Sequence, residues 1–258
     1  MSGDGFFVGW QSSVAPALRR FLLAVVAGIP VAMALLGGWL GGAATDRTGA
    51  AYGLVPGAKP PPPLPIGETA LEGVVTLAPY PVLHLPPAPG MPRGRSVLLA
   101  AEGKLGAMLP GALEGRRVAV GGYALARGEI DMVVLGEPPR VLEGGPGDVP
   151  AGVPVERLGR WRLSGEICDG KCAGGGMRPG TGLGHRACAT LCLDGALPAL
   201  FVSTAPVAGS AFLLLGAADG TAMPAALRAH IGAHVTLEGE VERRGAMLVF
   251  LADAGSLR

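Results

Sequence analysis

The sequence predicts a mainly β protein with one N-terminal transmembrane helix followed by two tandem OB-like barrels, the second carrying a Cys/His-rich insertion. Three observations lead to this prediction: an uncharged apolar run near the start, a pattern of alternating residues that occurs twice, and Gly- and Pro-rich segments beside each copy. Alternation around tight turns is typical of short strands. Five strands with a helix between the third and fourth are typical of an OB-type barrel. A different small barrel or a single β-sandwich is the alternative.

Composition limits the classes of partner. Charged residues make up 16% of the 258 residues, and the formal net charge is +1. Soluble domains carry about 25% charged residues, so the low fraction indicates that part of the chain lies in lipid. The near-zero charge and the 5% aromatic content argue against nucleic acid as a partner, because that binding needs positive charge and stacking side chains.

The apolar run covers residues 21–44 and reads FLLAVVAGIPVAMALLGGWLGGAA. About 20 helical residues cross a bilayer core, and proline and glycine are tolerated in such helices. Two arginines directly precede the run, which places residues 1–20 in the cytoplasm and everything after the span in the bacterial periplasm. The alternative is a signal peptide cleaved near residues 42–44, although the run exceeds the roughly 7–15 apolar residues of such peptides.

The part after the span divides at two segments rich in proline. Residues 45–67 include KPPPPLP, which favours an extended, semi-rigid spacer. Residues 137–158 form a linker rich in Gly and Pro. We expect the first OB-like barrel at 68–136 and the second at 159–258.

The two barrels are expected from an internal repeat. Residues 113–135 and 230–251 follow one pattern at an offset of 117, so that Gly115 aligns with Gly232. Each copy alternates apolar and polar residues around an Arg-Gly turn, which is a hairpin signature. The short helices expected before these hairpins are Leu105–Leu113 and Ala222–Ile231.

The second copy contains an insertion. Seven residues separate Gly73 from Pro81 in the first copy, whereas 32 separate Gly165 from Pro198 in the second, an excess of 25. The excess falls at residues 168–195 and holds all four cysteines. The loop after the first strand of an OB-type barrel often borders its ligand surface, so the insertion is the candidate site.

The insertion reads CDGKCAGGGMRPGTGLGHRACATLCLDG and has a donor pattern that suits a metal. HRACATLCLDG predicts a helix stopped by Gly195, with its histidine and both cysteines on one face. Thiolates and His185 could hold a metal, either zinc or an iron–sulfur centre; three cysteines and a histidine are a familiar zinc set, although the x3 spacings differ from the commoner x2. His185 and Cys192 would lie about 10 Å apart on an ideal helix, a distance that a cluster or a broken helix relieves. The candidate ligands are Cys172, His185, Cys188 and Cys192, with Cys168 as an additional candidate.

Two other interpretations of the cysteines remain open. An exported chain with an even cysteine count can form two disulfides, leaving His185 as a surface residue. Alternatively, Cys168 with Cys172 and Cys188 with Cys192 could be redox-active dithiols, although their x3 spacing differs from the usual x2 spacing.

The motif EICDGKC…HRACATLC, followed by GALPALFV, resembles one in a group of bacterial membrane-anchored exported proteins, and the FFVGW…LRRFLL start is similar too. In that group the position of Cys168 need not be cysteine. The resemblance therefore implies that Cys172, His185, Cys188 and Cys192 form the essential quartet, and it favours a metal over two disulfides. It implies no reaction.

These observations predict a membrane-anchored periplasmic accessory protein whose Cys/His segment binds zinc or an iron–sulfur cluster and serves a membrane or periplasmic redox complex. The alternative is a non-catalytic OB-type module that binds an oligosaccharide or a peptide and is held by structural disulfides. No carboxylate pair, activated nucleophile or phosphate-binding loop is recognisable, so the sequence favours a role other than an enzyme and assigns no catalytic residue.

Overall fold

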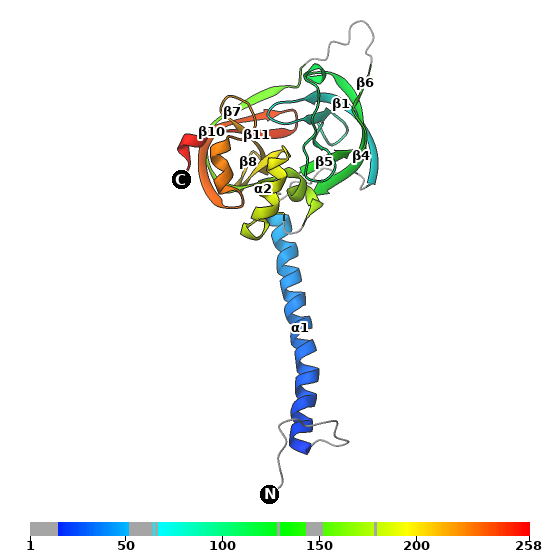
Figure 1. Cartoon of the computed structure of the whole chain (residues 1–258), viewed down its shortest axis with the longest axis vertical. Coiled ribbons are helices and arrows are strands. Elements are labelled where there is room, and N and C mark those ends of the chain that lie inside the picture. The colour runs from blue at the N-terminus through cyan, green and yellow to red at the C-terminus, as the bar shows by residue number, and fades with distance from the viewer. Residues whose placement is uncertain (1–14, 52–63, 65–66, 128–129, 143–151, 178–179) are drawn as a thin grey trace. The chain divides into compact units, whose positions relative to one another are not determined.

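The computed structural model describes residues 15–51, 64, 67–127, 130–142, 152–177 and 180–258 (Figure 1). Contacts within the chain divide it into two compact units, one before and one after the boundary between Thr48 and Gly49. The first unit is helical and the second is mainly β.

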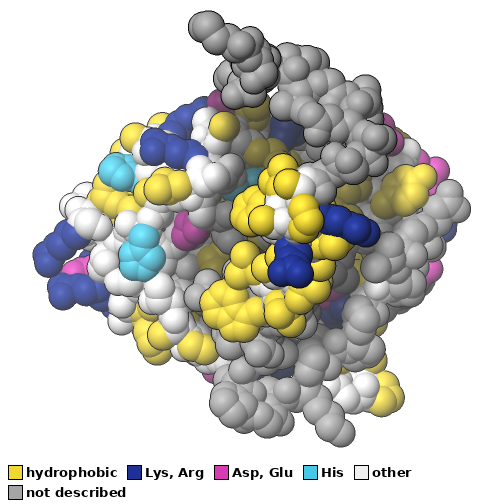
Figure 2. Space-filling view, turned by 90° about the horizontal axis from the view of Figure 1, so that it is seen from below, with side chains coloured by type: hydrophobic (Ala, Val, Ile, Leu, Met, Phe, Trp, Pro, Cys, Tyr) yellow, Lys and Arg dark blue, Asp and Glu magenta, His cyan; other side chains and the backbone are white. Residues whose placement is uncertain are grey.

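Helix α1 (Pro16–Ala51) forms the first unit and is a continuous helix with Pro30 inside it. Its segment Pro16–Trp39 has a mean hydropathy of 2.3 and none of that apolar surface is buried in the protein. Figure 2 views the molecule from below and shows these apolar side chains exposed. Among the described residues this is the one helix long and apolar enough to span a membrane. It continues past residue 44, so the first part of the expected spacer is helical, while most of KPPPPLP lies outside the described residues.

The first sheet is a barrel of five strands with a short sixth strand at its side. Its strands are neighbours in the order β1-β2-β3-β5-β4-β6, and β1 also pairs with β4, which closes the ring. The pair β3–β5 is parallel and the other pairs are antiparallel. The strands are β1 (Gly67–Thr76), β2 (Val82–Leu85), β3 (Arg95–Ala100), β4 (Arg117–Arg127), β5 (Ile130–Leu135) and β6 (Arg140–Val141).

The second sheet is a closed barrel with the strand order β7-β8-β9-β11-β10 and a closing pair between β7 and β10. Here β9 and β11 are the parallel pair. Phe201 and Phe250 meet inside it with ring centroids 5.3 Å apart. The strands are β7 (Val155–Asp169), β8 (Ala199–Val207), β9 (Ser210–Ala217), β10 (His234–Arg244) and β11 (Met247–Asp253).

The two barrels therefore share one order: the first strand pairs with the second and the fourth, and the third runs parallel to the fifth. The short helices predicted at 105–113 and 222–231 occur only as shorter 3₁₀ turns, at Gly111–Leu113 and Ala225–His230. Pro110 and Pro224 directly precede these turns with extended backbone, and a proline cannot continue an α-helical hydrogen-bond ladder.

The insertion lies between β7 and β8, where the first barrel has only the short connection from β1 to β2. It contains a π-helical turn at Cys172–Gly176, a 3₁₀ turn at Leu183–His185 and helix α2 (Arg186–Asp194). Gly195 is the C-cap of α2, as the sequence predicts. The helix begins only after His185, so His185 is not part of a regular helix with Cys192.

The hydrophobic core of the second barrel extends to the outer face of the first barrel, which also has a core of its own. Side chains alternate between the two faces of a strand, and on β3 Val97 and Leu99 point into the first barrel whereas Leu98 and Ala100 pack with the second. Every residue of β3 is buried. Met132 on β5 likewise packs with the second barrel. The insertion and the outer face of the first barrel thus belong to one packed body.

Candidate metal centre

Local structure brings the predicted ligands together from three short elements. The π-helical turn holds Cys172, and the Asp169 carboxylate at the end of β7 accepts a hydrogen bond from the Cys172 amide at 2.8 Å (Asp169 Oδ1). The 3₁₀ turn delivers His185, and one turn of α2 later comes Cys188. The chain therefore folds back on itself so that residues 13 positions apart in the sequence become neighbours.

The donor atoms are spaced for a single ion. The Cys172 and Cys188 sulfurs lie 3.9 Å apart. Donor atoms of Cys172, His185 and Cys188 all lie within 4.8 Å of one another, as do those of Asp169, Cys172 and Cys192. Zinc–sulfur bonds of about 2.3 Å in a tetrahedral site place two sulfurs roughly 3.8 Å apart. The four predicted ligands could therefore hold one metal ion.

The imidazole of His185 is oriented by a carboxylate. Its Nε2 lies 3.0 Å from Asp169 Oδ2, and the two side chains are 1% and 0% exposed. Since a carboxylate is an acceptor, Nε2 donates to Asp169, and Nδ1 of the neutral ring is then the nitrogen that has a free lone pair. Nδ1 is one of two buried side-chain nitrogen or oxygen atoms among the described residues without a hydrogen-bond partner. A histidine that donates its other N–H to a carboxylate is the usual arrangement around a bound metal.

All four cysteines are free thiols, so the disulfide interpretation is not what the structure contains. Burial raises the pKa of Cys192 to about 11, and it raises the pKa of Cys172 further. At neutral pH such thiols stay protonated, and a protonated thiol is a poor nucleophile. This environment disfavours redox-active dithiols, whereas a bound metal ion displaces the thiol protons.

Cys168, the additional candidate, belongs to neither donor group. It lies on β7 opposite Leu200 and is fully buried in the core of the second barrel. Burial, followed by the charges of Asp169 and Glu166, raises its pKa well above the ordinary value. The structure therefore places Cys168 as a packed thiol beside the centre.

Two site residues escape sequence reasoning. One is Asp169, which supports both Cys172 and His185. The other is Lys104, which comes from the loop after β3 in the first barrel and places Nζ 2.7 Å from the Cys188 sulfur and 3.6 Å from the Cys192 sulfur. The CDGKC segment displays Asp169 beside a cysteine, but no sequence pattern connects Lys104 to the insertion.

The chemistry open to this arrangement follows from its ligand count. Three cysteines and one histidine complete the coordination of zinc, and closed four-ligand sites are structural, whereas catalytic zinc sites keep a position for water. Both oxygens of Asp169 already accept hydrogen bonds from the centre, so this carboxylate acts as a support for the ligands. The geometry suits a metal that holds the insertion together.

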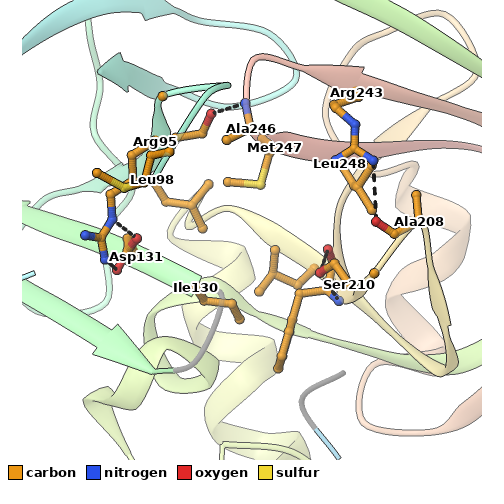
Figure 3. A pocket seen from close by; sticks show the side chains of 16 residues that line it. Arg95, Leu98, Ile130, Asp131, Ala208, Ser210, Arg243, Ala246, Met247 and Leu248 are labelled. Atoms are coloured by element: carbon orange, nitrogen blue, oxygen red, sulfur yellow. Dashed lines mark hydrogen bonds and ion pairs between the residues drawn. The ribbon is translucent and has the colours of Figure 1, made fainter. Parts of the chain in front are cut away.

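A cavity of about 240 Å³ between the barrels is the other candidate region (Figure 3). Arg95 pairs with Asp131 on one side of it, and Arg243 donates to the Ala208 carbonyl at 3.5 Å on the other. Arg243 Nε also lies 3.3 Å from a carboxylate oxygen of Glu156. In the part of the chain that the structure describes, Arg243 Nε is the second buried side-chain atom without a hydrogen-bond partner, but both arginines are in ion pairs, so the cavity gives a weaker chemical indication than the Cys/His centre.

Comparison with protein-family models, curated proteins and solved structures finds no match for this chain.

Proposed function

We propose that this protein is a membrane-anchored, exported accessory protein in which Cys172, His185, Cys188 and Cys192 bind one zinc ion. The buried, unpartnered Nδ1 of His185 is the observation that carries this proposal, because Asp169 holds the ring through Nε2 and a ring nitrogen of His185 lies within 4.8 Å of the Cys172 and Cys188 sulfurs. When bound, zinc supplies a cross-link between the π-helical turn and α2. The residues of the chain orient the ligands and exclude water from most of the centre.

Zinc fits the donor set better than an iron–sulfur cluster. Cubane and plant-type clusters are held by four cysteine thiolates, whereas here the donor atoms of Cys172, His185 and Cys188 lie within 4.8 Å of one another, and Cys192 forms a second such group with Cys172 and Asp169. Such close spacing suits one ion. Because zinc has no redox chemistry, we place the role of this protein in the assembly or scaffolding of a membrane or periplasmic redox complex, with no electron carried by its own centre.

We further infer that both barrels are OB-like. Support comes from the closed ring of five strands, the pairing of the first strand with the fourth, and the parallel pairing of the third with the fifth. A turn of 3₁₀ helix stands between the third and fourth strands of each barrel, where an OB-type barrel has its helix.

The metal content of the full-length chain tests the zinc proposal. Protein purified anaerobically in detergent without chelators is expected to hold about one zinc per chain, because the structure provides one set of four protein ligands. Elemental analysis gives the stoichiometry, and cobalt substitution should produce the thiolate-to-cobalt absorption of a tetrahedral site. A metal-free protein that still fails to take up zinc or cobalt after reduction would overturn the proposal.

The membrane topology is a separate expectation. Because Arg19 and Arg20 precede an apolar helix, we expect the N-terminus in the cytoplasm and the barrels in the periplasm. A phosphatase fused after residue 258 should be active outside the cytoplasm, and intact-mass spectrometry should find residues 1–44 retained. A mature N-terminus near Ala44 would show a cleaved signal peptide, and an inactive phosphatase would contradict export.

A further inference from the structure

We propose that occupancy of the Cys/His centre fixes the first barrel against the insertion, with Lys104 as the residue that couples the two; this inference rests on the zinc site proposed above. Lys104 belongs to the first barrel, yet its ammonium group contacts two of the ligand sulfurs in the second. A residue of the first barrel thus contacts the proposed metal centre of the second. Lys104 is not a ligand and acts as a positioning residue for the thiolates.

The loop at residues 101–106, which carries Lys104, is docked on the insertion by more than this one side chain. The Gly106 amide donates to the Gly195 carbonyl at 2.8 Å. From the opposite side, Lys171 Nζ donates to the carbonyls of Ala101 and Gly103 at 3.0 and 2.7 Å. The loop and the insertion therefore hold each other, with the loop donating a backbone bond to Gly195 and Lys171 of the insertion donating side-chain bonds to the loop.

The backbones at this contact are too close for any side chain. A Cβ added to Gly195 would lie 1.8 Å from the carbonyl oxygen of Lys104, and a Cβ added to Gly106 would lie 2.0 Å from that of Ala196. Gly195 itself has φ −79° and ψ 13°, a conformation that alanine adopts without strain. Alanine at this position would thus push the loop away while leaving the helix cap and the four ligands in place.

Charge explains why the docking depends on metal. A zinc ion with three thiolates and a neutral imidazole carries a net charge of −1, and its sulfurs are acceptors for charge-assisted hydrogen bonds. Lys104 brings one positive charge to this centre from an exposed position. When zinc is bound, the hydrogen bonds that Lys104 donates to Cys188 and Cys192 end on metal-bound thiolates and are charge-assisted. Metal binding and loop docking therefore favour each other.

Such coupling is reciprocal. If docking of the loop strengthens zinc binding by some factor, zinc strengthens docking by the same factor. Changes in the residues that support metal ligands cost about 10–100-fold in affinity, and Lys104 is solvent-exposed, so we expect a factor of about 10.

The experiment uses the full-length chain in detergent and two measurements. Competition with a chromophoric chelator gives the zinc Kd, and hydrogen exchange of the peptide that contains Gly106 reports docking with and without zinc. Lys104→Met and Gly195→Ala should each raise the Kd about 10-fold and remove the zinc-dependent protection of Gly106. Lys104→Arg, which keeps the charge, should restore most of the affinity that Lys104→Met loses.

Matched controls separate this coupling from general damage. Gly184→Ala adds a methyl group in the same insertion with no atom within 4 Å, and Arg116→Met removes an exposed positive charge from the same barrel. Both should bind zinc like wild type. If wild type binds zinc but Lys104→Met and Gly195→Ala do so within twofold of it, and Gly106 exchanges equally with and without metal, the coupling is wrong and the zinc site stands. If wild type binds no zinc, the proposed function itself fails.

Discussion

Replacing His185 with alanine is expected to weaken zinc binding by more than about 100-fold, because even supporting residues around a metal account for about 10–100-fold. The substitution removes the one nitrogen ligand and leaves the Asp169 carboxylate buried without the imidazole that it orients. Zinc Kd by chelator competition measures the effect. In the presence of zinc, the wild-type protein should also unfold at a higher temperature than the variant, since binding to the folded state alone stabilises it.

The matched control is His234→Ala, which removes an exposed histidine at the start of β10 and should bind zinc like wild type. Asp169→Asn should fall between the two, because an amide has only one oxygen for the two donors that Asp169 serves. A His185→Ala protein with wild-type zinc affinity would show that the imidazole is not a ligand.

Breaking the buried ion pair beside the interbarrel cavity is expected to have the largest effect on stability. Arg95 and Asp131 have side-chain exposures of 8% and 4%, and Arg95 Nη2 donates to Asp131 Oδ1 at 2.8 Å. Asp131→Ala removes the carboxylate that compensates a buried guanidinium, which typically costs about 3–5 kcal/mol. Urea unfolding of the full-length chain in detergent, followed by tryptophan fluorescence, gives the change in the free energy of unfolding.

A surface pair in the second barrel provides the comparison. Arg162 Nε donates to Glu238 Oε1 at 2.8 Å, but Arg162 is 60% exposed, so Glu238→Ala should lower the free energy of unfolding far less than Asp131→Ala does. Replacing both buried partners, as Arg95→Met with Asp131→Leu, should recover most of the lost stability because no unpaired charge remains. If Asp131→Ala costs no more than Glu238→Ala, the buried pair does not stabilise the fold.

The sequence predicted those features that leave a local or repeated pattern. The Arg-Gly hairpins and the helix stopped by Gly195 are set by residues close together in the chain, and α2 ends where expected. The second barrel was predicted because its pattern repeats that of the first. The residues of β3 do not alternate between apolar and polar in a way that reveals one buried face, because both faces of this strand are buried. The two short helices were predicted too long, because Pro110 and Pro224 restrict each segment to a 3₁₀ turn.

The candidate site divides along the same line. Three of the four predicted ligands lie in HRACATLC, where their spacing can be read from the sequence. Cys172 lies in the nearby CDGKC segment of the same insertion and was therefore included among the candidates. The separation of about 10 Å expected between His185 and Cys192 assumed one regular helix, whereas α2 begins only after His185. Lys104 could not be predicted, because its contact with Cys188 depends on how two barrels pack, and packing across 84 positions leaves no mark on local composition.

The double burial of β3 also has a consequence for how this chain is made. The last strand of the first barrel's ring ends at Leu135. Leu98 and Met132 lie on the outer face of this barrel, and the side chains that cover them come from the second barrel, which is synthesised later. A nascent chain therefore carries a folded or half-folded barrel with an apolar stripe exposed until the last strand arrives, and such surfaces promote aggregation. Truncation after the first barrel creates the same exposed stripe permanently. The two barrels are repeats in sequence but a single unit in folding.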